Sequence, residues 1–200
     1  MQDIGGKLSR FMNDDVEWTD LTPLGPQCSS RSRSVRINYF SEYRRASRTL
    51  FESTNGQEMF RSIGEHIAMN LGEDDYIWSG NEGSVKPQLS LDPSKYLLPK
   101  QAGTNRYRHI SNAAIIYAAK PCANLRSLLN ACDIEPESWT ESVECETILQ
   151  FVTRTSVRDP YSTASVSLWV FDRWQAEYLY EYFEQLPYTE PSLQCVAYRF

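Results

Sequence analysis

The chain has 200 residues and a formal net charge of −6, with 41% hydrophobic residues, twelve tyrosines and five tryptophans. This apolar and aromatic content is enough for a packed core, which excludes a chain that is disordered throughout. No apolar run is long enough to span a membrane, and residues 1–6 begin no apolar leader. We therefore expect a soluble intracellular protein, cytoplasmic or nuclear, with no membrane partner.

The first half of the chain divides into two predicted parts. Residues 1–35 mix glycine, proline and serine with few periodic apolar positions, which predicts an extended, loop-rich N-terminal segment. Residues 36–106 are expected to form a small α+β extension. Alternation predicts a strand over 35–40, and an apolar stripe predicts a helix over 57–71 that Gly72 ends. A short strand over 76–78 follows.

The second half, residues 107–200, shows a different order of patterns. We predict strands over 113–119, 147–153, 165–171 and 193–200, and helices over 121–132 and 173–185. The acidic stretch 133–146 is expected to be a loop or a frayed helix end. Asp159-Pro160 is a turn signal that would make the middle two strands a hairpin. This order, βαββαβ, predicts an α+β protein whose C-terminal half is a ferredoxin-like sandwich.

Three pieces of this half carry a family resemblance. Ile116 and Tyr117 end the first predicted strand, residues 121–130 form the first helix, and Trp169 and Phe171 lie two residues apart on a strand. In these pieces, residues 113–200 resemble an RNA-recognition-motif domain. The resemblance implies an open sheet face on which Tyr117, Trp169 and Phe171 stack on unpaired bases. Arg154, or Arg199 on the last strand, would then contact a phosphate.

Other ferredoxin-like families share this topology. One is the dimeric DNA-binding domain of papillomavirus regulatory proteins, which reads DNA with its first helix. Here that helix offers only Asn124, Arg126 and Asn130 for the same role.

Basic residues gather near the start of the first predicted strand. Six arginines fall within residues 31–48 against the single acid Glu42: Arg31, Arg33, Arg36, Arg44, Arg45 and Arg48. In a chain of net charge −6, this excess predicts a surface for phosphates or for an acidic partner. The alternative is a solvated strand face.

Catalytic and metal-binding signatures are missing from the sequence. It has no P-loop, no nucleophile elbow and no H-E-x-x-H, and its five cysteines include no C-x-x-C pair. We expect no enzyme, no cofactor and no metal. One catalytic alternative is a nucleophile pair of Cys122, at a helix N-terminus, with His109.

These patterns predict a non-catalytic binding module for single-stranded RNA. The alternative is a protein-interaction module or a structural subunit of a larger assembly, viral assemblies included. The acidic balance of the chain favours that alternative. The identity of the partner and the oligomeric state remain open.

Overall fold

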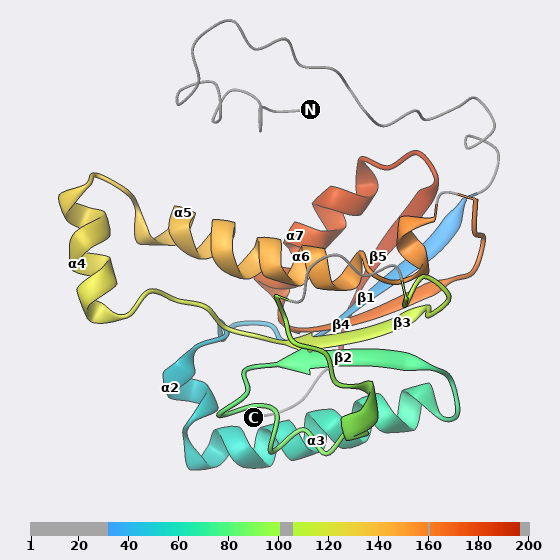
Figure 1. Ribbon diagram of the computed structural model, residues 1–200, viewed down its shortest axis with the longest axis horizontal. Helices are drawn as coiled ribbons and strands as arrows, with labels where there is room; N and C mark the ends of the chain where they lie inside the picture. Colours follow the sequence, from blue (N-terminus) through green and yellow to red (C-terminus); the bar gives the residue numbers. More distant parts are fainter. Residues whose placement is uncertain (1–31, 101–105, 160, 197–200) are drawn as a thin grey trace, which may run out of the picture.

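A five-stranded sheet lies between two layers of helices in the computed structural model, which describes residues 32–100, 106–159 and 161–196 (Figure 1). The strands are β1 (Arg33–Ser41), β2 (Tyr76–Gly80), β3 (Asn112–Ile116), β4 (Val166–Asp172) and β5 (Thr189–Cys195). They lie in the order β2-β3-β4-β1-β5, and all the pairs are parallel. Parallel strands need crossover connections, and these place helices on both faces of the sheet.

The expected ferredoxin-like α+β sandwich is therefore wrong, and the protein has an α/β fold. β4 pairs with β3 and β1, both parallel, so it forms no hairpin with the segment before it. β1 and β2, which come from the first half of the chain, lie in the same sheet as the later strands.

Two helices cover the sheet face below the strands in Figure 1, α2 (Arg48–Phe51) and α3 (Thr54–Leu71). The Ser53 side chain caps α3 by accepting a hydrogen bond from the Gly56 N–H at 3.0 Å. Gly72 ends it with a φ of 55°, a conformation that favours glycine. Residues from α3, including Phe60, pack with Trp78 and Phe171 of the sheet into one core cluster. The predicted helix is thus confirmed.

The opposite face is covered by one long helical stretch and by α7 (Arg173–Glu184). The stretch is built from α5 (Pro136–Thr140), the π-helical segment η3 (Glu141–Cys145) and α6 (Glu146–Val152), and α4 (Ala123–Ala131) precedes it. Two short 3₁₀ turns, η2 (Pro93–Lys95) and η4 (Ser156–Arg158), lie in the connections.

The predicted strand over 147–153 is wrong, because this segment is α6. Its β-branched and aromatic side chains Ile148, Phe151 and Val152 share one buried helix face, in the core cluster that includes α7. The hydroxyl of Thr147 donates to the Val143 carbonyl four residues earlier, which suits a helix. Thr153 does the same to the Leu149 carbonyl at 2.8 Å. The acidic stretch before α6 is helical from Pro136 on and forms the first half of the same helix, whereas residues 133–135 are a short non-helical connection before it.

Candidate functional site

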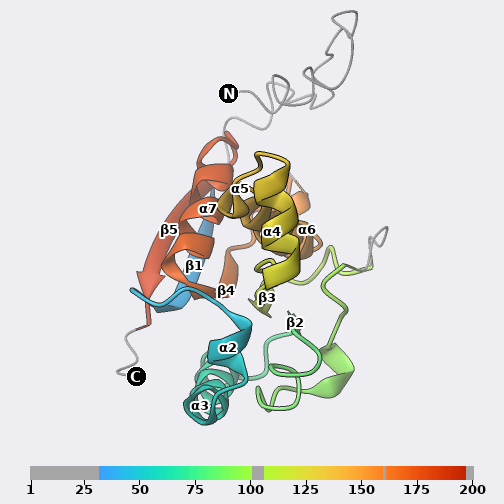
Figure 2. The same cartoon turned by 90° about the vertical axis from the view of Figure 1, so that its left-hand side faces the viewer.

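The carboxyl ends of β1 and β4 are adjacent, and their connections leave in opposite directions. β1 leads through α2 and α3 to the far edge strand β2, whereas β4 leads through α7 past β1 to β5. In open parallel sheets, ligands bind outside the carboxyl ends at such a switch point. Figure 2 looks onto this edge, with α2 on one side of the strand ends and α4 on the other. We call it the carboxyl edge.

The loop that follows β1, residues 42–47, is fixed at several points. The Ala46 N–H donates to the Asp172 carboxylate at 2.6 Å. The Arg44 N–H donates to the Ser41 hydroxyl, which in turn donates to the Arg44 carbonyl. The Arg45 guanidinium lies 3.6 Å from the centroid of the Trp174 ring, a cation–π contact. The loop therefore has one defined conformation.

Two side chains project from this fixed loop. Tyr43 is 94% exposed, and the Arg44 side chain beside it is also exposed. A large aromatic ring that the protein itself leaves uncovered adds no packing energy to the fold. The loop thus presents an aromatic ring and a guanidinium to solvent on a rigid base.

A buried hydrogen-bond network supports the carboxyl edge from below. Gln175, on α7, donates from Nε2 to the Glu144 carboxylate at 2.7 Å and to the Tyr117 carbonyl at 2.9 Å. Its Oε1 accepts from the Phe171 N–H at 3.1 Å. Glu144 also accepts from the Ala119 N–H at 2.7 Å, and it belongs to the π-helical segment. Such segments re-aim side chains within a helix and are frequent at functional sites.

Two acids of the edge, Glu144 and Asp172, are buried, whereas Arg45, Lys120 and Arg126 are exposed. Burial raises the pKa of Glu144 and that of Asp172, although backbone N–H groups partly oppose the shift. Desolvation by the surrounding protein lowers the pKa of Lys120, and Arg45 and Arg126 lower it further, whereas Glu144 and Asp172 raise it. Lys120 therefore lies near two other cations and also near the two buried acids of the edge.

A hollow of about 550 Å³ adjoins this edge at the end of β2. It is lined by residues that include Asn81, Lys100 and Tyr117. The Asn81 side chain pairs with the Ala118 backbone in both directions, each bond 2.9 Å long, and so connects the ends of β2 and β3. Lys100 and Glu82, which carry opposite charges, both line this hollow.

The structure does not bring the three predicted stacking aromatics onto one open face. Trp169 and Phe171 point to the face that α3 covers, and they are 5% and 0% exposed. Tyr117 follows the end of β3 and packs, half-buried, against the core cluster of the opposite face. The two-residue spacing correctly placed Trp169 and Phe171 on one side of a strand, but that side belongs to the core.

The predicted arginines fall into three groups. Arg33 and Arg154 are buried and donate to backbone carbonyls, those of Ser156 and Leu98 among others. Arg36 lies on the sheet face, away from the carboxyl edge. The third group reaches the carboxyl edge and consists of Arg44, Arg45 and, at the start of α2, Arg48. Arg31 and Arg199 lie outside the described residues.

Sequence reasoning missed the residues that organise this edge. Glu144, Lys120 and Gln175 come from separate segments, and only the strand order brings them together. Asp172 was recognisable as a helix cap, which it is, since it accepts from the Gln175 N–H at 3.0 Å. Tyr43 had one signal, an aromatic residue directly before two arginines.

The proposed cysteine–histidine pair is not brought together. Cys122 starts α4 beyond the carboxyl end of β3. His109 lies where β2 and β3 begin, 3.8 Å from the Asp75 carboxylate. Among the residues that the structure describes, no three His, Cys, Asp or Glu side chains form a metal-binding group. In the same residues, no helix is long and apolar enough to cross a membrane.

Comparison with known proteins gives no relative: no family model, no curated protein and no solved structure matches this chain. The chemistry of the carboxyl edge therefore carries the functional conclusion.

Proposed function

We propose that this protein binds single-stranded nucleic acid, with RNA as its ligand, at the carboxyl edge of the sheet. The observation that carries the proposal is Tyr43, 94% exposed on a rigid loop and followed by Arg44 and Arg45. Single-strand binding needs exposed aromatic rings next to basic side chains. Each nucleobase offers a π-face to a ring, and each linkage offers a phosphate to a basic side chain. The function predicted from the sequence is kept, but its location moves from the sheet face to the strand ends.

The charges of the edge support this ligand in a chain of net charge −6. Asp172 and Glu144 are buried and accept hydrogen bonds from backbone N–H groups, so they do not face the solvent. Glu42 is paired with Arg173, and Glu52 is paired with Arg48. The exposed side chains that remain at this edge include Arg44, Lys120 and Arg126, which present positive charge to a phosphate backbone.

The test is fluorescence anisotropy of a labelled mixed-sequence RNA of roughly 12 nucleotides, a length within typical single-strand site sizes. Tyr43→Ala removes one stacking ring and should weaken binding roughly 5- to 150-fold, the equivalent of about 1–3 kcal/mol. Because Tyr43 is almost fully exposed, the variant should unfold at the same urea concentration as the wild type. The matched control is Tyr161→Ala, which removes another exposed tyrosine, at 70% exposure.

Salt dependence tests the phosphate contacts separately. Arg44→Ala should weaken binding and reduce the slope of log affinity against log salt by about 0.7, the value for one phosphate on a single strand. Arg61→Ala removes an exposed arginine of α3 and should leave the slope unchanged. If RNA binding is absent, or if Tyr43→Ala binds as tightly as Tyr161→Ala, the proposal is wrong.

A protein partner is the second candidate, and α4 favours it. This helix buries only Leu129, while Leu128 on the same helix and Ile134 beyond it are 59% and 45% exposed. Figure 1 shows α4 projecting from the body of the molecule. A partner bound there would contact apolar surface, so its affinity should change little with salt. Leu128→Ser should then abolish binding that Tyr43→Ala leaves intact.

A further inference from the structure

β1 lies inside the sheet, yet one of its faces is polar. Parallel strands are normally covered on both faces and read as nearly continuous apolar runs. β1 instead alternates: Val35 and Ile37 point into the core, whereas Arg36 and Asn38 point to the other face. Arg36 and Asn38 thus interrupt the apolar pattern expected of an interior parallel strand, and they add nothing to the packing of the core. Their presence suggests a role other than packing.

The neighbouring strands continue the polar pattern in register. Asn38 lies between Trp169 on β4 and Gln194 on β5. One row further toward the amino ends, Arg36 lies between Ser167 and Ser192. Residues paired in parallel strands point to the same face. The sheet therefore carries two adjacent polar rows, one with two amides beside a tryptophan and one with a guanidinium between two hydroxyls.

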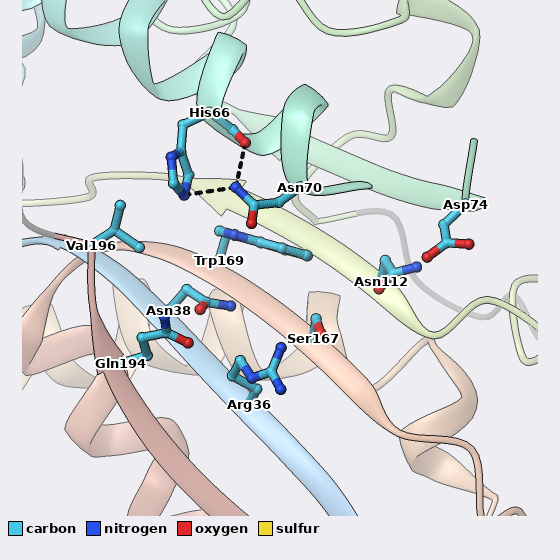
Figure 3. A pocket seen from close by; sticks show the side chains of 10 residues that line it. All are labelled: Arg36, Asn38, His66, Asn70, Asp74, Asn112, Ser167, Trp169, Gln194 and Val196. Atoms are coloured by element: carbon cyan, nitrogen blue, oxygen red, sulfur yellow. Dashed lines mark hydrogen bonds between the residues drawn. The ribbon is translucent and has the colours of Figure 1, made fainter. Parts of the chain in front are cut away.

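α3 covers only part of this face and leaves a groove of about 310 Å³ beside it. Figure 3 shows side chains converging on the groove from the sheet below and from α3 above. His66 and Asn70 form its upper wall, and the Asn70 amide nitrogen is 2.9 Å from both Nε2 and the carbonyl oxygen of His66. These bonds leave the Asn70 oxygen pointing down toward Trp169 (Figure 3).

The lower wall keeps hydrogen-bonding capacity that the fold does not use. The Asn38 amide nitrogen donates to the Leu168 carbonyl at 3.0 Å, which fixes the amide and leaves its oxygen free to accept. Within the described part of the chain, the side chains of Arg36, Ser167 and Gln194 make no hydrogen bond to another residue. The groove thus offers donors, acceptors and one guanidinium that a ligand could satisfy together, and the Asp74 carboxylate also lines it.

Size and chemistry limit the class of ligand. A volume of about 310 Å³ lies at the lower end of small-molecule sites, so it suits one compact polar molecule. Asparagine and glutamine amides pair with the hydrogen-bonding edges of nucleobases through one donor and one acceptor each. Arginine is the preferred partner of phosphate, because its fork of donors matches the phosphate oxygens.

We propose that this groove is a binding site for a nucleoside monophosphate, whose base contacts Asn38 and Gln194 and whose phosphate contacts Arg36. The two polar rows are successive on the sheet, so the base and the phosphate would lie along the direction of β1. The groove shares no lining residue with the carboxyl edge, and the proposal does not depend on the RNA-binding function.

The experiment is a titration of the ¹⁵N-labelled protein with AMP, GMP, CMP and UMP, each followed by two-dimensional NMR and by calorimetry. At least one nucleotide should bind saturably at micromolar to millimolar concentration and shift the side-chain amide signals of Asn38 and Gln194. Gln194→Leu and Arg36→Ala should each weaken that binding at least tenfold. Both side chains are exposed, so neither change should alter the unfolding midpoint.

Control variants test whether nucleotide binding is confined to the groove. Ser34→Ala and Glu190→Gln change the next row on the same face, which does not line the groove, and should bind as the wild type does. Tyr43→Ala should also bind normally, because the carboxyl edge is not involved. The proposal is overturned if no nucleotide saturates, if binding survives both groove substitutions, or if inorganic phosphate competes as well as the nucleotide does.

Discussion

Arg33 belongs to the basic cluster that the sequence assigned to a phosphate-binding surface, but its contacts indicate a structural role. Its side chain is 0% exposed. The guanidinium donates to the carbonyls of Ser156 at 2.7 Å, Asp159 at 2.6 Å and Ser162 at 3.0 Å. It thereby holds the connection from η4 to β4 against the first residue of β1.

Replacing Arg33 with methionine keeps the approximate length of the side chain and removes all of these donors. Removing one partner of a buried charged network costs about 3–5 kcal/mol, since the remaining polar groups lose their partners. A protein of this size has a free energy of unfolding of about 5–15 kcal/mol, so the loss is a large share. With a urea m-value near 2 kcal/mol/M, the unfolding midpoint should fall by roughly 2 M.

Urea unfolding followed by tryptophan fluorescence measures this loss. Arg33→Lys should lose most of the same stability, because an ammonium group cannot reach three carbonyls in a plane. Arg36→Met is the matched control on an exposed arginine of the same strand and should change stability by less than about 0.5 kcal/mol. If Arg33→Met loses less than about 1 kcal/mol but no longer binds RNA, the structural role is wrong.

Two further predictions concern packing and pH. Gly64→Ala would place a methyl group 1.6 Å from the Leu89 carbonyl oxygen, so α3 and the 85–91 segment must separate. We expect a stability loss of about 1–3 kcal/mol or more by urea unfolding, whereas Gly83→Ala, with open space around it, should be neutral. Hydrogen bonds from Tyr39 and Arg173 lower the pKa of Glu42 in the folded protein. The stability that Glu42 adds is therefore complete above its unfolded pKa of about 4.3 and is lost as the pH falls through the lower folded value. The stability difference between wild type and Glu42→Gln should stay constant from pH 8 to 6 and close below about pH 4; a difference that grows in acid would contradict this sign.

Local patterns predicted most of the elements. Alternation identified β1 and β4, and the apolar stripes identified α3 and α7, because each pattern reports a period within one segment. The prediction for residues 147–153 failed because Ile148, Phe151 and Val152 favour strands in isolation, and tertiary packing on the sheet made the segment a helix. That single error changed the order of elements into the ferredoxin-like one.

Strand pairing could not be read from the sequence, and the site depended on it. No local sequence pattern indicates that β1 lies between β4 and β5 rather than in a separate extension. The basic cluster was found as a run of residues, but its members point in different directions. Arg33 turns into the interior, Arg36 faces the sheet groove, and Arg44 reaches the carboxyl edge.

Asp172 connects the fold to the proposed site through one carboxylate. One of its oxygens caps α7 at the Gln175 N–H, and the other fixes the loop after β1 at the Ala46 N–H. Burial raises its pKa and so disfavours the charged form, yet both oxygens accept from backbone donors, which favour that form. A residue needed only as a helix cap could be an exposed serine or asparagine. The hydrogen bond from the Ala46 N–H explains why a buried acid stands here, because that bond fixes the loop that carries Tyr43 and Arg44.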